Sequence, residues 1–378
     1  MKTAYYMNVL KCIAEGAAPS KETVENLSVQ ELCDFSMLNK IPVLIAELLP
    51  YWKVKTEEEQ KLVTDWKNEA LHLVFEEHKK LQLVKRLLTE SEKRRIPLLF
   101  FKGYLLAELY KNFTLRNSSD TDILVEKADF ERTVLMLQDL NYRPASELDT
   151  KNVYTFLYEE NGMQIHKIEL HTSLYEDADG EELVQLNKLR MTAAEHIISV
   201  NSCGMEIKTM RQTEHFIYQI FHMVKHFCCH GFPARYLVDT ALFVRKYGNQ
   251  IDWGKVDVAM GQLGYHKFYR HLMMILNRYF DLPVDNIWSS KKGYSTETME
   301  ELLQDILGFG ARSFGEEVSG AFYYFETYVE KLEKKSRKKI EQIVFDGTLV
   351  PEKVVALLLQ QSEKLQKRMN LLRKLELI

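Results

Sequence analysis

The most restrictive feature of the chain is a short apolar run that begins directly after two aspartates. Residues 120–125 read Asp-Thr-Asp-Ile-Leu-Val, and an unbroken aliphatic and β-branched run is typical of a strand that is covered on both faces of a sheet. Side chains alternate along a strand, so Asp120 and Asp122 would point the same way, about 7 Å apart. Two carboxylates this close repel each other unless a cation lies between them, and Mg²⁺ suits such a pair.

Length and composition are those of an ordinary globular protein. With 378 residues, of which 46% are hydrophobic and 28% charged, the chain can bury a large core and form two or three domains. No apolar run reaches the roughly 18 residues of a membrane span. The five cysteines are scattered without CxxC spacing, so neither a disulfide framework nor a zinc ribbon is indicated, and a cytoplasmic location is expected.

The hydrophobic pattern divides the chain into three regions. Residues 1–95 carry apolar side chains at three- and four-residue spacing, which predicts an N-terminal helical region. Residues 96–210 alternate short apolar strands with helices, which predicts an α/β (α+β) core with a small mixed sheet of four or five strands. Residues 211–378 return to the helical pattern and are expected to form a C-terminal helical domain. The expected strands are residues 97–101, 120–125, 152–158, 163–174 and 204–210.

Paired aspartates occur in several known arrangements. An EF-hand calcium loop needs a further oxygen ligand and a glycine, where this chain has Leu124 and Val125. In haloacid-dehalogenase-like phosphatases and many nucleotide-sugar glycosyltransferases the acidic pair follows an apolar strand, whereas here it precedes one. This order disfavours the phosphatase more than the DxD-type glycosyltransferase, which stays open as an alternative.

Residues 98–125 resemble the polymerase-β-like nucleotidyltransferase superfamily, in which a strand, a glycine turn and a helix lead to an acidic pair at the start of the next strand. More closely, about residues 30–250 are similar to an uncharacterised bacterial nucleotidyltransferase family. The matching positions are Lys102, Gly103, Tyr110, Arg116, Asp120, Asp122, Glu169, His171, His222, Lys225, His226, Arg235 and Asp239. The resemblance implies Mg²⁺- or Mn²⁺-dependent transfer of a nucleoside monophosphate from an NTP to an acceptor hydroxyl, with release of pyrophosphate.

The resemblance also implies roles for eight of these residues. Asp120, Asp122 and Glu169 would be the catalytic carboxylates and would hold two metal ions, one on the triphosphate and one on the attacking hydroxyl. The nucleotide-binding residues would be Lys102, Gly103, Arg116, Lys225 and His226. A glycine at a strand-to-helix turn lets the backbone approach a phosphate, a helix N-terminus offers N–H groups, and cations neutralise phosphate charge.

One departure from the superfamily lies at the turn, where Tyr104 follows Gly103 in place of the usual serine or glycine. Backbone amides or Lys102 would then have to bind the triphosphate. A degenerate member, retained as a nucleotide-binding or protein-interaction module, is therefore a further alternative. The net charge of −4 favours a small-molecule or protein acceptor over nucleic acid and gives no attraction to an anionic membrane.

Structural roles compete with some of these assignments. Glu169 shares a strand face with Lys167 and could lie on a solvated surface. His222 and His226 have the i, i+4 spacing that can bind zinc, but they equally suit a polar helix face that lines a cleft. Arg235 and Asp239 are also four residues apart, which predicts an ion pair along one helix.

Overall fold

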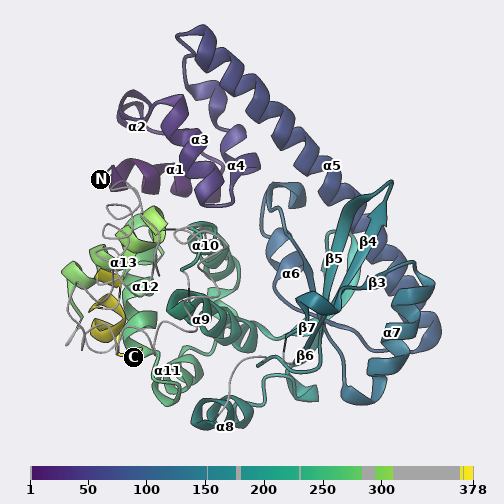
Figure 1. Cartoon of the computed structure of the whole chain (residues 1–378). Helices are drawn as coiled ribbons and strands as arrows, with labels where there is room; N and C mark the ends of the chain where they lie inside the picture. Colours follow the sequence, from purple (N-terminus) through teal and green to yellow (C-terminus); the bar gives the residue numbers. More distant parts are fainter. Residues whose placement is uncertain are drawn as a thin grey trace, which may run out of the picture.

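The computed structural model describes residues 2–150, 152–175, 180–229, 231–282, 294–309, 367–368 and 370–377 (Figure 1). Most of the helical tail that the sequence predicts up to residue 378 lies outside these residues. Between residues 2 and 94 the chain is mostly helical, as the apolar spacing predicts. The helices are α1 (Thr3–Glu15), α2 (Lys21–Asn26), α3 (Val29–Leu38), α4 (Pro42–Ala46) and α5 (Glu57–Arg94).

Local sequence signals explain where these helices begin. Ser28 precedes α3 and forms a capping box with Glu31, in which each side chain binds the other residue's backbone N–H. Thr56 accepts a hydrogen bond from the Glu59 N–H at the start of α5. The 38-residue α5 also has three glutamates in its first turn and two basic residues in its last, which favours both ends of the helix dipole.

Seven strands form one mixed sheet in the order β3-β4-β5-β2-β1-β7-β6. They are β1 (Leu99–Phe100), β2 (Thr121–Leu124), β3 (Arg143–Pro144), β4 (Val153–Glu160), β5 (Met163–His171), β6 (Ile197–Ser202) and β7 (Met205–Met210). β2 lies between β1, to which it is antiparallel, and β5, to which it is parallel. The mixed α/β class is confirmed. The sheet is larger than predicted because β3 is two exposed residues and β6 is a mostly half-exposed edge strand, so neither shows a buried apolar run.

The remaining helices are α6 (Gly103–Ala107), α7 (Phe130–Asp139), α8 (Gly180–Lys188), α9 (Gln212–Cys229), α10 (Arg235–Tyr247), α11 (Trp253–Gln262), α12 (His266–Phe280) and α13 (Thr296–Phe309). Helix α6 begins at Gly103 as expected but has only five residues. Beyond it, Glu108 accepts a hydrogen bond from the Cys203 N–H (2.7 Å), and Tyr110 donates one to Asp239 (2.8 Å). These tertiary contacts hold the chain where a longer helix would have continued.

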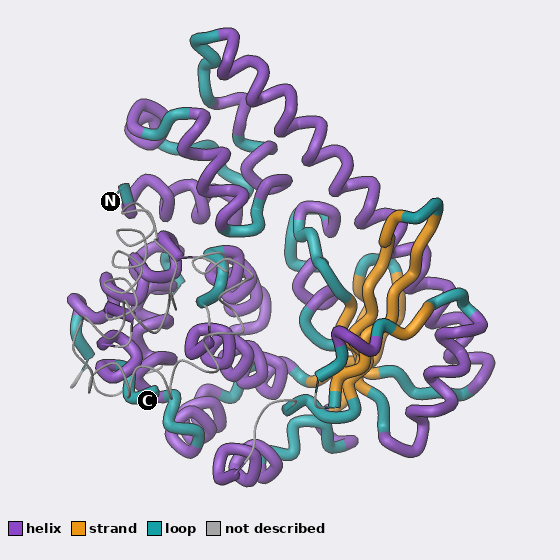
Figure 2. Tube along the Cα trace, in the orientation of Figure 1, coloured by secondary structure: helices purple, strands orange, loops and turns teal. Residues whose placement is uncertain are grey.

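Two hydrophobic clusters lie on opposite sides of the sheet. One cluster packs α5 and α7 against the strands, through residues such as Val84, Met136 and Ile168. The other cluster joins the first and last helices, since Leu10 of α1 and Leu276 of α12 belong to it together. Figure 2 accordingly shows the orange strands between α7 on one side and the α9–α10 layer on the other. No helix in the described part of the chain is both long and apolar enough to cross a membrane.

Candidate active site

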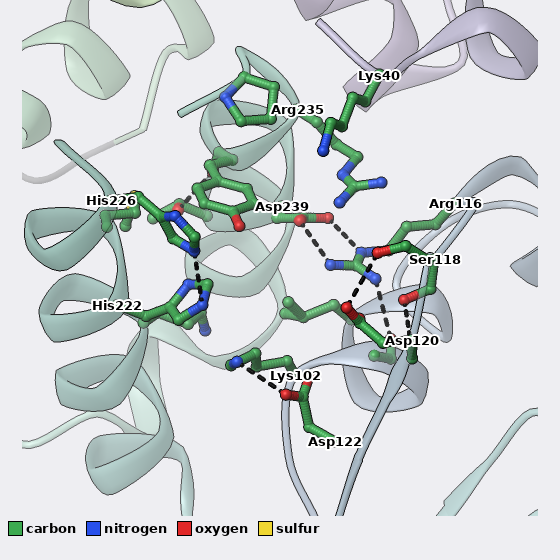
Figure 3. Close-up of a pocket in the computed structure, with 18 of the residues that line it drawn as sticks. Lys40, Lys102, Arg116, Ser118, Asp120, Asp122, His222, His226, Arg235 and Asp239 are labelled. Carbon is green, nitrogen blue, oxygen red and sulfur yellow. Dashed lines mark hydrogen bonds and ion pairs between the residues drawn. The ribbon is translucent and has the colours of Figure 1, made fainter. Parts of the chain in front are cut away.

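A cavity of about 250 Å³ lies where the N-terminal helices, the sheet and the helices α9 and α10 meet (Figure 3). Its lining includes every residue that the sequence resemblance proposed for the site: Lys102, Gly103, Arg116, Asp120, Asp122, Glu169, Lys225 and His226. Lys40, from the turn between α3 and α4, also lines it. Asp120, Asp122 and Glu169 therefore lie in the same cavity as several lysine and arginine side chains.

The three carboxylates come from neighbouring strands. Asp120 lies directly before β2, and Asp122 pairs in register with Glu169 on the parallel strand β5. One ligand atom each from Asp122, Glu169 and His171 lies within 4.8 Å of the others, so that these three residues could hold a metal ion. Carboxylate oxygens are the ligands that Mg²⁺ prefers. The sheet register thus creates the acidic wall.

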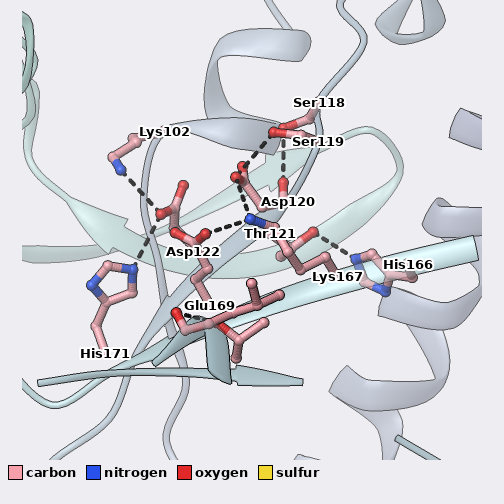
Figure 4. A network of polar contacts seen from close by, with 12 residues as sticks. Lys102, Ser118, Ser119, Asp120, Thr121, Asp122, His166, Lys167, Glu169 and His171 are labelled. Atoms are coloured by element: carbon pink, nitrogen blue, oxygen red, sulfur yellow. Dashed lines mark hydrogen bonds and ion pairs between the residues drawn. The ribbon is translucent and has the colours of Figure 1, made fainter. Parts of the chain in front are cut away.

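Asp122 is buried and is held by two neighbours (Figure 4). The Nζ atom of Lys102 lies 3.0 Å from Asp122 Oδ1, and the Nε2 atom of His171 lies 3.2 Å from the same oxygen. Burial alone would raise the pKa of the Asp122 carboxyl, but Lys102 and His171 outweigh burial and hold that pKa below its ordinary value. Asp122 is therefore ionised at neutral pH.

Lys167 lies between the other two carboxylates. Its Nζ atom is 2.6 Å from Glu169 Oε1 and 3.4 Å from Asp120 Oδ2. Burial raises the pKa of Glu169, the charges of Asp120 and Asp122 raise it further, and Lys167 opposes them. Sequence reasoning did not assign Lys167 to the site. The signal was present, because Lys167 and Glu169 are two residues apart and share a strand face.

The strand-to-helix turn takes its unusual conformation at Lys102. Lys102 has φ 60°, and its backbone N–H donates a hydrogen bond to His215 Nε2 (3.2 Å). A Cβ added to Gly103 would meet no described atom within 4 Å beyond its chain neighbours and its own helix, so the backbone there is open to close approach. Since α6 has only five residues, it adds little to the expected helix dipole.

Arg116 forms a buried ion pair with Asp239 on α10. Arg116 Nε and Nη2 donate to the two carboxylate oxygens at 2.8 and 3.0 Å, and Tyr110 donates to the same carboxylate at 2.8 Å. Burial would lower the pKa of Arg116, but Asp239 outweighs it and raises that pKa. Arg116 Nη1 also donates to the Gly103 carbonyl (3.4 Å), so the pair connects α10 to the turn.

The sequence-based prediction of an ion pair between Arg235 and Asp239 is wrong. Arg116 occupies Asp239, while Arg235 donates from Nη1 to the backbone carbonyl of Asn117. The i, i+4 spacing does place the two side chains on one helix face. Arg116, from the loop before β2, donates to both oxygens of the Asp239 carboxylate, and this two-bond geometry is stronger than a single contact from Arg235.

The sequence pattern of a family described as uncharacterised nucleotidyltransferase matches residues 10–281, a range that includes every residue that lines the cavity. The chain belongs to this family. A search of curated proteins gives no match.

Solved structures resemble this chain only distantly. The solution structure of the antibiotic-resistance factor ANT(2'')-Ia is 13% identical, with 54% of this chain and 98% of that one covered and a TM-score of 0.35. A crystal structure of ANT(2'')-Ia in complex with adenylyl-2''-tobramycin is 12% identical to this chain, with 53% of this chain and 99% of that one covered and a TM-score of 0.33. The crystal structure of an antigenic nucleotidyltransferase-like protein from Paracoccidioides brasiliensis is 14% identical, with 53% of this chain and 93% of that one covered and a TM-score of 0.34.

The tyrosine after the glycine turn lies in a hydrophobic cluster and does not line the cavity. Tyr104 is 8% exposed, belongs to the cluster that packs α5 against the sheet, and is not among the residues that line the cavity. Its side chain cannot replace the usual serine. Contacts from the turn to a phosphate would therefore come from Lys102 and from the open backbone at Gly103.

The two α9 histidines that line the cavity contact each other. The Nε2 atoms of His222 and His226 lie 3.0 Å apart, so one ring donates a hydrogen bond to the other. Burial lowers the pKa of His222 well below its ordinary value, and the nearby charge of Lys102 lowers it further. Because each ring occupies the other's nitrogen, the contact favours a polar cavity wall over a zinc site. The group of described residues that could hold a metal ion is instead Asp122, Glu169 and His171.

Helix α5 holds the loop that leads to Asp120, and sequence reasoning missed this contact. Ser118 donates its backbone N–H to Glu77 Oε1 (3.1 Å), and Lys80 donates to the Ser118 carbonyl (2.8 Å) and to Glu77 (3.0 Å). The Ser118 hydroxyl then donates to the Asp120 carbonyl (2.7 Å). Glu77 and Ser118 are 41 residues apart, and no local pattern connects them.

Proposed function

We propose that the protein is a Mg²⁺-dependent enzyme that transfers a nucleoside monophosphate from an NTP to an acceptor hydroxyl and releases pyrophosphate. One observation carries the proposal: Asp120, Asp122 and Glu169 meet at one wall of a cavity that also has several cationic side chains. Membership of the nucleotidyltransferase family supports the class of reaction. The acceptor in this proposal is a small molecule or a protein side chain.

The acidic wall fits a hard divalent cation. The carboxylates of Asp120, Asp122 and Glu169 would hold Mg²⁺, and the ligand atoms of Asp122 and Glu169 are already close together. Bound Mg²⁺ would supply neutralisation of charge on the transferred phosphoryl group and on the attacking and leaving oxygens. The ammonium groups of Lys102 and Lys167 contact these carboxylates in this structure, so a bound cation would share the oxygens with them.

Residues of the cavity would bind the donor's phosphates and accept the proton of the acceptor hydroxyl. Lys102, at the turn, and Lys225, on α9, bind phosphate oxygens of the donor, and the Gly103 backbone lets the phosphates approach. Arg116 is largely engaged by Asp239 and acts by holding the Gly103 carbonyl. Glu169 accepts the proton of the acceptor hydroxyl, and His226 forms part of the wall beside the nucleotide.

The test is a binding titration with ATP, GTP, CTP and UTP, with and without Mg²⁺, followed by an assay for released pyrophosphate. We expect metal-dependent binding of at least one NTP by the wild type and loss of binding and transfer in Asp122→Asn. Asp65→Asn, at an exposed position on α5, is the matched control. Full activity in Asp122→Asn would overturn the proposal.

Two other outcomes separate the alternatives. Release of a nucleoside diphosphate from a nucleotide sugar would identify a glycosyltransferase. Tight NTP binding without transfer to any acceptor would favour a nucleotide-binding module, and the contacts of Lys102 and Lys167 with the carboxylates are the observation in favour of that second candidate.

A further inference from the structure

His215, on α9, contacts the strand-to-helix turn of the cavity. Its ring is buried and stacks on Phe243 of α10, with ring centroids 5.3 Å apart. The Lys102 backbone N–H donates to His215 Nε2 (3.2 Å), at the residue whose φ of 60° and ψ of −109° shape the turn. The stacking fixes the plane of the ring, so both ring nitrogens point in fixed directions.

The contact with Lys102 decides which ring nitrogen of His215 carries a proton. A backbone N–H can only donate, so Nε2 must offer its lone pair. Burial, together with the charges of Arg116 and Lys102, lowers the pKa of His215 to about 3, so at neutral pH the ring is neutral and has one proton. That proton is consequently on Nδ1, which becomes a hydrogen-bond donor.

Gln219, one turn further along α9, faces that donor. In one of the two possible orientations of its amide, Nε2 lies 3.1 Å from His215 Nδ1. The other orientation exchanges the amide oxygen and nitrogen with almost no change in shape. Nε2 beside Nδ1–H would set two donors against each other, whereas Oε1 accepts the hydrogen bond. The stable orientation therefore has Oε1 toward His215 and the NH₂ group turned away from it.

The NH₂ group of Gln219 is open to a ligand in the cavity. Gln219 is 7% exposed and lines the cavity together with Lys102, Gly103 and His222. Its second amide atom has no hydrogen-bond partner among the described residues and is not sealed from solvent. Since a single imidazole ring separates this amide from the Lys102 N–H, the NH₂ group lies beside the turn. A largely buried N–H group calls for an acceptor, so this one points to a ligand that supplies an oxygen.

We propose that Gln219 donates its amide NH₂ to a phosphate oxygen of the NTP, and that His215 is the positioning residue that sets this orientation. The identity of the ligand rests on the proposed function. Phosphates are expected at this turn because Lys102 brings positive charge and the backbone at Gly103 is open. Lys102 is shared with Asp122, whereas a neutral amide donates to an oxygen without pairing with the carboxylates.

Nitrogen-15 NMR of the histidine rings tests the orientation in the protein without ligand. At pH 7.5 the ring of His215, assigned by the signals that are lost in His215→Gln, should carry its proton on Nδ1 and none on Nε2. A purely structural role for His215 would not require either tautomer. A proton on Nε2 would turn the Gln219 nitrogen back toward the ring and overturn the proposal.

Two substitutions of Gln219 test the contact with the ligand. Gln219→Met removes both amide groups, whereas Gln219→Glu keeps an acceptor for the His215 Nδ1–H and removes only the donor. Calorimetric titrations of each variant use pyrophosphate and the four NTPs with Mg²⁺. Gln82→Met, at an exposed position on α5, is the control. Thermal unfolding shows whether each variant is folded.

We expect Gln219→Met to weaken the binding of pyrophosphate and NTP about tenfold, and Gln219→Glu to weaken it at least as much, while Gln82→Met leaves it unchanged. Wild-type affinity of folded Gln219→Met, or intact binding in Gln219→Glu, would overturn the proposal. Weaker NTP binding with unchanged pyrophosphate binding would place the amide at the base or ribose and overturn the assignment to a phosphate.

The contact from Gln219 and the metal-dependent mechanism fail in different ways. If Asp122→Asn retains transfer while Gln219→Met loses pyrophosphate binding, the contact stands and the mechanism falls. If Asp122→Asn loses NTP binding while Gln219→Met binds every probe normally, the mechanism stands and the contact falls. Wild-type protein that binds neither pyrophosphate nor any NTP in the presence of Mg²⁺ would overturn both.

Discussion

The ammonium group of Lys167 lies 2.6 Å from a carboxylate oxygen of Glu169, two residues further along the same strand. The two side chains share a strand face, and Lys167 also lies 3.4 Å from Asp120. A positive charge built into the sheet therefore offsets the repulsion between the carboxylates before any metal binds. The stability of this wall should depend on Lys167 most strongly when metal is withheld.

Lys167→Met should destabilise the metal-free protein by about 1–3 kcal/mol, because two partly buried carboxylates lose their shared counter-charge. Added Mg²⁺ or Mn²⁺ should restore much of this loss, since a cation that binds only the folded state stabilises it. Thermal unfolding in EDTA and in Mg²⁺ measures both effects. Lys79→Met, which removes an exposed ion pair with Glu160, is the control and should show no metal dependence. Equal metal responses in the two variants would contradict the role of Lys167.

Asp239→Asn should reduce the free energy of unfolding by about 3–5 kcal/mol. Arg116 would keep its charge in a buried position and lose its ionised partner, which is far more costly than removal of both groups. Tyr110→Phe removes only the third contact to the same carboxylate and should cost about 1.5 kcal/mol. Urea unfolding of both variants measures the two losses in the free energy of unfolding. A loss below about 1 kcal/mol for Asp239→Asn would refute the prediction that this variant is the more destabilised.

Glu77→Ala should lower turnover about 10- to 100-fold, because Ser118 and the loop before Asp120 lose their contact with α5. Affinity for Mn²⁺, measured by electron paramagnetic resonance, should fall as well. Glu76→Ala, one position earlier on α5, removes a contact with His72 and provides the comparison. Wild-type metal affinity in Glu77→Ala would show that the contact does not position Asp120.

Stability should fall as the pH decreases below about 6.5. Burial lowers the pKa of His166 and His215 to about 3, from an ordinary value of 6.5. Between these values the unfolded state binds more protons than the folded state, so each histidine makes unfolding easier by about 1.4 kcal/mol per pH unit as acid is added.

His166→Gln isolates one of these contributions. The change in the free energy of unfolding between pH 7 and pH 5 should become smaller by about 2 kcal/mol than in the wild type. Urea titrations at the two pH values provide the measurement, and identical pH dependence in His166→Gln and wild type would show that His166 already takes up its proton in the folded state.

Sequence reasoning located the features that depend on local periodicity. The apolar run from Ile123 to Val125 indicated a buried strand, and the two-residue repeat placed Asp120 and Asp122 toward one side of it. The same repeat put Glu169 on the face of another strand, and the glycine at position 103 marked the start of a helix. These properties follow from backbone geometry and from burial of nearby side chains, which a short stretch of sequence specifies.

Only the tertiary structure decided which distant groups meet. It paired Arg116 with Asp239, 123 residues away, in place of the expected partner Arg235, and it brought Lys40 to the cavity through the Asn39–Ala234 hydrogen bond. An amphipathic pattern shows which face of a helix is buried but not which helix covers it, because hydrophobic attraction is not directional. Partner choice depends on how the shapes and charges of the whole core fit together, and that information is distributed over the entire chain.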